Sequence, residues 1–491
     1  MLLCFGDILR GNNYMLYKRL MSFLIKPEGF FVCIGLFMGF IFIVIVPPFQ
    51  TPDENIHFYR AYEVSELELP HKISTGETGS YLPLSIEQTQ SAVHGVYAGP
   101  NTSGHIMFNP SEKYDYRYTK SALFDIPLNK KVHTFYNTSG SPAYMPLSYL
   151  PQAAVVALAR FINAPVIVML YLTRIINLLT FVVLAYFGIK LFPWKKWALV
   201  AICLFPVVVS QTISPGLDAG IFGATLIFVG LIFKTLSNKQ FNLQYRHLVI
   251  LLITSLVMIF GKSVLILFLP LIFLVRKKQI GIRYARFVKP FIALVPVILY
   301  LLWSVLSVAA GSSADQSSGS LQTHIFLSNP LVFVSSLINT FIFITPSGDI
   351  LAQSMVGSFG WLDTPLAPTF VALGYIFLSF ILVANYEPVR NSLKITRGIR
   401  ILLFTISLSY IVAVFLAMYI YFTPVGGNHI RGVSGRYLVP TLFLAVPTLF
   451  SNIIRVGEKT YINCVKVVSI FLLLISVLTI VLRYYVTFIP Q

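Results

Sequence analysis

The sequence predicts an all-α polytopic membrane protein, and three observations support this fold class. Hydrophobic residues make up 56% of the 491 residues and charged residues only 11%, with a mean hydropathy of +0.78. Apolar runs of about 20 residues, long enough to cross a bilayer as a helix, recur along the chain. Most of the 36 lysines and arginines stand in short clusters between these runs. Because cytosolic anchoring explains such clusters, the net charge of +18 requires no nucleic-acid partner.

The order of the crossings follows when the basic clusters are placed in the cytosol. Residues 1–29 then form the cytosolic N-terminus, and 30–46 form the first crossing. Residues 47–142 form a long outer loop in which amphipathic helices are expected, and long loops of this kind are usually functional. The other predicted crossings are 166–190, 197–213, 216–234, 247–260, 263–276, 290–310, 366–386, 401–421, 437–454 and 465–488.

Two apolar stretches, 143–162 and 331–345, leave the total open at about 11 to 13 transmembrane helices. If 143–162 crossed the membrane alone, the lysines between 190 and 196 would lie outside, against the positive-inside bias. We therefore expect 143–162 to form a partial or surface-lying helix. The predicted divisions are a core membrane module over 30–310, a second outer region over 311–365, and C-terminal transmembrane helices over 366–491.

The most informative segment, 51–58, directly follows the first crossing. If it is helical, Asp53, His57 and Arg60 share one face, because their spacing is i, i+4 and i+7. We predict Asp53 as a catalytic base, Glu54 as a second carboxylate or metal ligand, and His57 and Arg60 as substrate-binding residues. The alternative is that Glu54 belongs to a capping box with the threonine three residues before it.

A second segment, 426–440, is predicted to be an outer loop that leads into a helix. Its four glycines let backbone amides approach an anion. Arg431 and Arg436 carry forked donors suited to phosphate, and His429 is a candidate substrate-binding residue. The alternative is a flexible loop whose arginines reach toward lipid headgroups.

Other candidates stand singly at predicted outer helix ends. Lys262 is a candidate phosphate ligand or a snorkelling anchor, and Arg174 requires a carboxylate or a phosphate as its partner. Asp218 is a candidate substrate-binding residue or a favourable charge at a helix start. Trp361 beside Asp363 is a pairing that suits sugar binding, although tryptophan is also common at membrane interfaces.

Motifs of soluble enzymes are absent from the sequence. It contains no Walker A loop, no HExxH and no paired CxxC, and the four cysteines suggest no disulfide framework. No cytosolic segment is long enough for a soluble nucleotide-sugar-binding domain. No cofactor is firmly implied, and a divalent Mg or Mn ion remains possible.

The chain resembles a bacterial family of multi-pass membrane proteins, formerly of unknown function, that groups with the GT-C glycosyltransferases of cell-surface polysaccharide clusters. The resemblance rests on four stretches, 47–62 (PPFQTPDENIHFYRAY), 141–152 (SPAYMPLSYLPQ), 360–365 (GWLDTP) and 432–440 (GVSGRYLVP). It implies a GT-C fold and transfer of a sugar from a polyprenyl-phosphate carrier at the outer membrane face. It also implies that Asp53 is the base and Arg436 a donor-phosphate ligand. The segment 214–218 departs from the family pattern, so the resemblance assigns no role to Asp218.

The predicted function is therefore that of an inverting hexosyltransferase in the bacterial cell membrane, with its active site on the extracytoplasmic side. Its partners would be a polyprenyl-phosphate sugar, a glycan or lipid-linked acceptor, and membrane lipids. Two alternatives remain: a polysaccharide polymerase or ligase that uses lipid diphosphates, and a flippase for lipid-linked sugars. Transporters usually show internal repeats, and none is visible in this sequence.

Overall fold

The computed structural model describes most of the chain. The described residues are 22–69, 71–72, 78–93, 97–100, 106–108, 113–138, 144–281, 285–309, 316–342, 346–387, 395–449 and 454–486. Most of the predicted cytosolic N-terminus, together with parts of both predicted outer regions, lies outside these residues.

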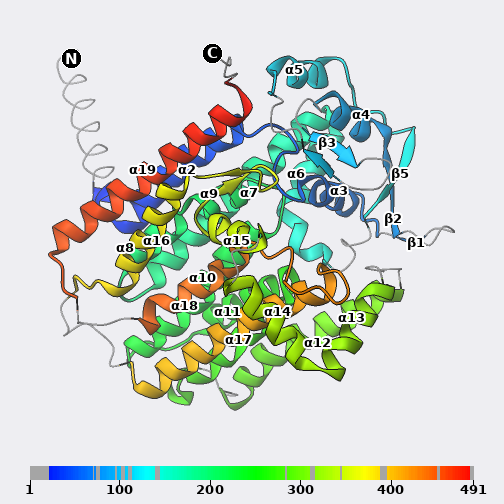
Figure 1. Ribbon diagram of the computed structural model, residues 1–491. Coiled ribbons are helices and arrows are strands. Elements are labelled where there is room, and N and C mark those ends of the chain that lie inside the picture. Colours follow the sequence, from blue (N-terminus) through cyan, green and yellow to red (C-terminus); the bar gives the residue numbers. More distant parts are fainter. Residues whose placement is uncertain are drawn as a thin grey trace, which may run out of the picture.

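Long apolar helices dominate the structure and confirm an all-α polytopic membrane protein (Figure 1). Six helices among the described residues are long and apolar enough to cross a membrane. They are α2 (Pro27–Ile45), α7 (Val166–Leu191), α10 (Asp218–Ser237), α12 (Ala285–Ala309), α17 (Arg397–Tyr421) and α19 (Glu458–Tyr484). The share of residues buried inside the protein, taken over the most apolar 18-residue stretch of each helix, is 83% for α10 but only 17% for α12. Helix α10 therefore lies at the centre of the bundle.

Several predicted crossings are shorter or broken. The crossing expected at 197–213 consists of two helices, because the backbone is extended at Phe205 and Pro206 starts a new helix. The shorter elements of the bundle are α8 (Lys196–Cys203), α9 (Pro206–Thr212), α11 (Tyr245–Gly261), η3 (Ser263–Leu274), η4 (Lys277–Gln279), α16 (Pro368–Val383), η6 (Gly435–Leu438) and α18 (Val439–Thr448).

The first outer region combines short helices with a small sheet. Its helices are α3 (Glu54–Ser65), α4 (Leu84–Ala92) and α5 (Tyr116–Phe124), and it is followed by η2 (Pro146–Tyr149) and α6 (Leu150–Phe161). Strands β1 (His71–Lys72), β2 (Thr78–Pro83) and β5 (His133–Asn137) pair antiparallel in that order, and β3 (Tyr97–Pro100) pairs with β4 (Ile106–Phe108). The sequence analysis expected only helices here, and it missed the pairing of β2 with β5 because the two strands lie far apart in the sequence.

The two undecided stretches do not form simple crossings. Within the first, 143–162, the described residues form η2 and the 12-residue helix α6, which is too short to cross a membrane and packs on α3 and α7. The second falls largely in α14 (Pro330–Ile342), which is bent by 105° against α13 (Gln316–Ser328). The second outer region continues with α15 (Pro346–Val356), β6 (Ser358–Phe359) and β7 (Thr364–Pro365).

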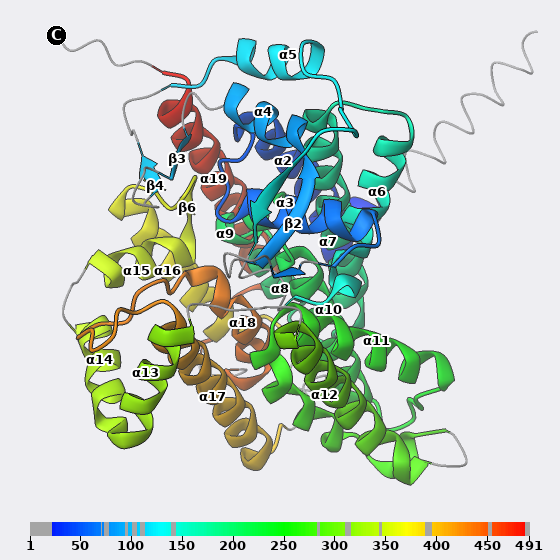
Figure 2. The same ribbon diagram turned by 90° about the vertical axis from the view of Figure 1, so that its right-hand side faces the viewer.

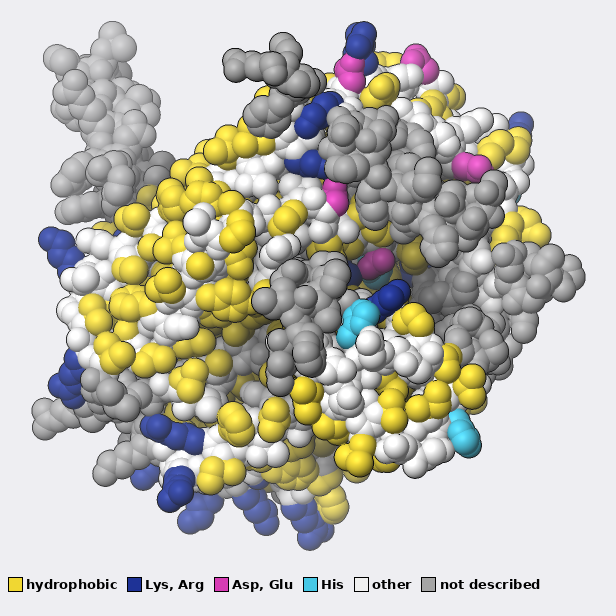
Figure 3. Space-filling view, in the orientation of Figure 1, with side chains coloured by type: hydrophobic (Ala, Val, Ile, Leu, Met, Phe, Trp, Pro, Cys, Tyr) yellow, Lys and Arg dark blue, Asp and Glu magenta, His cyan; other side chains and the backbone are white. Residues whose placement is uncertain are grey.

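The bundle has two chemically different ends. At one end, α2 finishes beside the start of α7 and the last residues of α19, because Tyr485 donates to the carbonyl of Ile45 at 2.9 Å. The first outer region covers this end, and α3, α4 and β2 lie together above α7 and α9 (Figure 2). Lysine and arginine side chains gather along the lower and left margins of the face in Figure 3, away from most of the acidic ones. This separation matches the charge asymmetry on which the predicted topology rests.

Candidate functional site

Arg436 lies at the centre of a charged cluster at the end of the bundle that the first outer region covers. The turn η6 begins at Gly435, where a Cβ atom would lie 2.2 Å from the backbone of Met355. Only glycine permits so close an approach to α15, and its N–H donates to the hydroxyl of Ser354 at 2.8 Å. This contact fixes η6 and places the side chain of Arg436 inside the protein, where the residue is 8% exposed.

The guanidinium of Arg436 joins four elements. Its Nη2 donates to Asp53 Oδ2 at 2.8 Å and to the hydroxyl of Tyr437 at 3.2 Å. Its Nη1 donates to Gln211 Oε1 at 2.8 Å and lies 3.9 Å from Asp218 Oδ2. These partners come from the turn before α3, from η6 itself, from α9 and from the first residue of α10. A single buried cation therefore lies between two carboxylates.

Asp53 occupies a strained turn between α2 and α3. Its φ of 62° lies in the left-handed region, which aspartate adopts more readily than most residues. Its side chain is 44% exposed, against 10% for Arg436. Burial raises the pKa of Asp53, but the charge of Arg436 and its hydrogen bond to the carboxylate outweigh this effect and hold the pKa below its ordinary value. Asp53 is therefore an ionised, accessible carboxylate at neutral pH.

His57 lies one helical turn after Asp53. Its Nδ1 forms a hydrogen bond of 2.7 Å with the hydroxyl of Tyr149, and its ring lies 5.7 Å from the ring of Tyr144. Burial lowers the pKa of His57, against the opposite pull of Asp53 and Asp218. The imidazole is therefore neutral at pH 7, a form able to donate and to accept hydrogen bonds.

Lys262 supplies a second cation to the cluster. Its Nζ lies 3.9 Å from the centre of the Tyr437 ring, and the guanidinium carbon of Arg436 lies 5.1 Å from the same centre. Burial lowers the pKa of Lys262 to about 7, so Arg436 and a partly protonated Lys262 face two carboxylates, Asp53 and Asp218. The space-filling view shows a hollow on this side of the molecule, with acidic, basic and histidine side chains at its edge (Figure 3).

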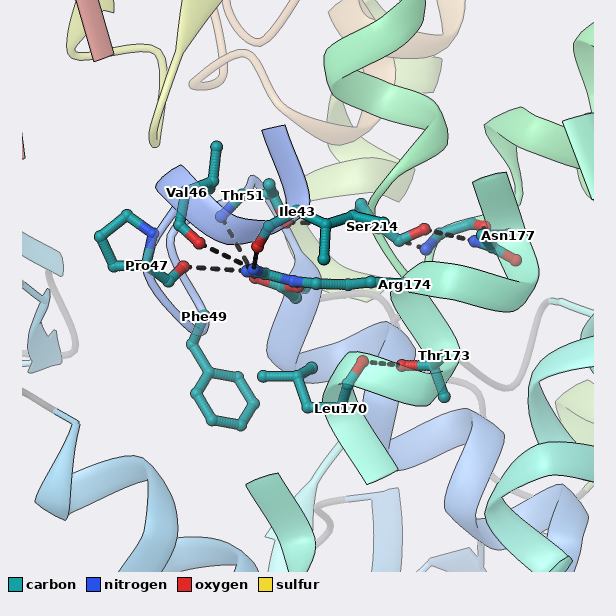
Figure 4. Close-up of polar contacts among 12 residues, drawn as sticks. Ile43, Val46, Pro47, Phe49, Thr51, Leu170, Thr173, Arg174, Asn177 and Ser214 are labelled. Atoms are coloured by element: carbon teal, nitrogen blue, oxygen red, sulfur yellow. Dashed lines mark hydrogen bonds and ion pairs between the residues drawn. The ribbon is translucent and has the colours of Figure 1, made fainter. Parts of the chain in front are cut away.

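Two polar residues of α7, Arg174 and Asn177, hold the segments that lead to Asp53 and Asp218, and Figure 4 shows these two side chains with backbone groups that they contact. Arg174 donates to the carbonyls of Ile43, Val46 and Pro47 at 3.3, 2.7 and 2.9 Å, and so holds the turn that leads to Asp53.

Asn177, one turn further along α7, donates to the carbonyls of Ser214 and Gly216. Gln152 from α6 adds bonds of 3.3 Å to the carbonyls of Pro215 and Gly216. These contacts hold the bend from which α10 starts, and the bend in turn places Asp218 beside Arg436.

A family model described as a predicted membrane protein (DUF2142) matches residues 36–445, which is most of the chain. The chain belongs to the DUF2142 family. No curated protein and no solved structure matches it. The part shared with the DUF2142 family contains Asp53, Asp218, Lys262 and Arg436, and it ends before α19.

Two of the predicted site residues of this DUF2142 protein form a buried ion pair away from the cluster. Glu54 accepts bonds of 2.6 and 2.8 Å from Nε and Nη2 of Arg174, and both side chains are 0% exposed. Glu54 also accepts a bond of 3.4 Å from the N–H of Thr51, one half of the capping box. Glu54 is therefore enclosed, and every N–H edge of Arg174 already donates to Glu54 or to a backbone carbonyl. Of the two partners considered for Arg174, a carboxylate or a phosphate, the structure shows the carboxylate of Glu54.

Arg60 does not extend the face formed by Asp53 and His57. It is 0% exposed, pairs with Glu63 at 2.8 Å and donates to the carbonyl of Tyr144 at 3.3 Å. The cation that contacts Asp53 is instead Arg436, which lies 383 residues further along the chain than Asp53.

His429 and Arg431 lie in the loop before η6. Arg431 is exposed, and its N–H donates to the hydroxyl of Thr423 at 3.1 Å. His429 Nδ1 contacts Asn428 at 2.8 Å. Within the described part of the chain, neither side chain bonds to Arg436, so the structure does not bring them into the cluster.

Trp361 and Asp363 belong to the hairpin of β6 and β7. The Nε1 of Trp361 donates to the carbonyl of Phe49 at 3.2 Å, and Asp363 pairs with Arg483 at 3.1 Å. The hairpin therefore ties the end of α19 to the turn before Asp53, and its carboxylate already has a cation.

The sequence analysis missed several residues of the site. Tyr144 and Tyr149 lie within a stretch that carried the family resemblance, but nothing in their spacing pointed to His57. Gln211 stands in an apolar segment without any motif. Across the described residues, no group of three His, Cys, Asp or Glu side chains is placed to hold a metal ion.

Proposed function

We propose that this DUF2142 protein is a GT-C-type glycosyltransferase that moves a sugar from a polyprenyl-phosphate donor to a hydroxyl of a glycan or lipid-linked acceptor. The observation that carries the proposal is the pairing of an accessible carboxylate, Asp53, with a buried forked cation, Arg436, at a helix end of a membrane bundle. Such a pair offers a base for the acceptor and a ligand for the phosphate within one site.

The proposed reaction is a single displacement. Asp53 takes the proton of the acceptor hydroxyl while the oxygen of that hydroxyl forms a bond to the anomeric carbon. The bond from that carbon to the phosphate oxygen breaks, and the electron pair leaves with polyprenyl phosphate. Arg436 and Lys262 stabilise the charge of the leaving group. Because the attack comes from the side opposite the phosphate, the anomeric configuration inverts.

The charge balance of the site favours a monophosphate donor over a diphosphate. Arg436 and Lys262 are already offset by Asp53 and Asp218, so the site has little surplus positive charge. The polar groups gather at a helix end rather than at the middle of broken crossings, which favours an enzyme over a flippase. The proposed location is the bacterial plasma membrane, with the cluster on its extracytoplasmic side.

The test is to incubate the purified protein in lipid nanodiscs with polyprenyl-phosphate hexoses and, in parallel, with polyprenyl-diphosphate sugars. The proposal predicts a glycosylated product and free polyprenyl phosphate from at least one monophosphate donor. Product from diphosphate donors alone would make the protein a polymerase or ligase. Movement of donors across vesicle membranes, without any transfer, would make it a flippase.

A further inference from the structure

The edge of Arg436 formed by Nε and Nη2 has a shape that suits a phosphate, and its Nη2 donates to Asp53 and to the hydroxyl of Tyr437. The edge formed by Nε and Nη2 can hold two oxygens at once, as Arg174 does with both oxygens of Glu54 at 2.6 and 2.8 Å. At Arg436, Asp53 occupies only Nη2, and Nε is a buried nitrogen without a hydrogen-bond partner. The same edge therefore differs between the two arginines. Both of its nitrogens have partners in Arg174, whereas only Nη2 has partners in Arg436.

We propose that the donor phosphate displaces Asp53 from Arg436 and thereby releases the carboxylate that acts as the base. This inference rests on the proposed function. A phosphate that accepts hydrogen bonds from Nε and Nη2 gives Nε a partner. Asp53 does not, because it accepts a bond from Nη2 only.

The carboxylate, rather than the arginine, is the partner that moves. Arg436 is 10% exposed in its side chain and is fixed by Gln211 on its other edge, whereas Asp53 is 44% exposed. Asp53 also lies in a turn between two helices, and its left-handed backbone is a conformation that stores strain. A small change of this turn withdraws the carboxylate without disturbing the bundle.

The exchange orders the reaction. While Asp53 accepts a bond from a guanidinium, it is a weak base, because the ionised form is stabilised. Donor binding removes that stabilisation, so the base becomes effective only when a sugar is present. When polyprenyl phosphate leaves, Asp53 returns to Arg436 and gives its proton to solvent.

The experiment measures the affinity of farnesyl phosphate, a short isoprenoid monophosphate, for the purified protein and three variants. Asp53→Asn should bind it about tenfold more tightly than wild type, because the competing charge-assisted hydrogen bond is lost. Asparagine tolerates a left-handed backbone, which keeps the turn intact. If that variant does not fold, Asp53→Gly takes its place, since glycine also accepts this conformation.

Asp218→Asn is the matched control, because it removes the same charge from a position 3.9 Å from Arg436 without a hydrogen bond. The exchange requires a clearly smaller gain in affinity from Asp218→Asn than from Asp53→Asn. Equal gains, or no gain from Asp53→Asn, would overturn the exchange. Arg436→Ala separates the two ideas: if it binds farnesyl phosphate as well as wild type, the phosphate site and the proposed function fail together.

Discussion

Among single residues, Arg174 and Arg436 show that a sequence alone does not separate an arginine enclosed by its partners from one that faces an exposed carboxylate. Both stand in or beside apolar segments, and both were predicted as phosphate ligands. The difference depends on which groups meet them: three carbonyls and Glu54 surround Arg174, whereas Arg436 faces an exposed carboxylate. Because these partners lie more than a hundred residues away, helical spacing could not reveal them.

Glu54→Gln should reduce stability more than activity per folded molecule. It removes one partner of an ion pair that is fully buried, and breaking such a pair costs about 3–5 kcal/mol. The measurement is the unfolding midpoint of the purified variant in detergent. Asp115→Asn is the control, because its pair with Arg117 is exposed to solvent, where ion pairs contribute little to stability. An unchanged midpoint with lost transfer would instead make Glu54 a reacting group.

At the scale of elements, the position of Arg436 depends on the contact between η6 and α15. Gly435→Ala would place a Cβ atom 2.2 Å from the backbone of Met355, which has no flexible end that can move aside. We expect η6 to shift and farnesyl phosphate to bind at least about tenfold more weakly, because a displaced Arg436 loses a charge-assisted contact worth about 1.5–3 kcal/mol.

The control for this variant is Gly398→Ala in the first turn of α17, where a Cβ atom meets nothing within 4 Å. Isothermal titration of both variants gives the comparison. Equal affinities for the two variants would show that the close packing of η6 does not position Arg436.

Element types were predictable where local rules decide them. The charge clusters anticipated that 143–162 would not cross alone, and α6 is indeed a short helix that packs on α3 and α7. The break at Pro206 and the small sheet were not anticipated. The sheet requires β2 to pair with β5 across some fifty residues, and long-range pairing leaves no local periodicity. The site itself draws on α3, η2, α9, α10, α11 and η6, which only the tertiary fold brings together.

For the whole molecule, the proposed reaction depends on which end of the bundle faces outward. The positive-inside rule predicts that the end with Asp53 and Arg436 faces outward and that the basic end around η4 faces the cytosol. Both ends offer exposed positions for a label: Ser91 on α4 and Lys278 in η4.

In a cysteine-free background, Ser91→Cys should react with a membrane-impermeant maleimide in intact cells. Lys278→Cys should react only after the cells are permeabilised. The reverse pattern would invert the topology and place the cluster in the cytosol, where polyprenyl-phosphate sugars on the outer face cannot reach it.

If Asp53 is the base of a transfer reaction, its amide variant must lose turnover. The decisive measurement compares the turnover of Asp53→Asn with that of Asp115→Asn. Both variants exchange one outer-region carboxylate for the matching amide, but only Asp53 contacts Arg436. With the donor found in the nanodisc assay at saturation, Asp53→Asn should lose transfer about a hundredfold or more, as expected for a missing general base. Asp115→Asn should turn over at the wild-type rate. Wild-type turnover by Asp53→Asn would contradict the account.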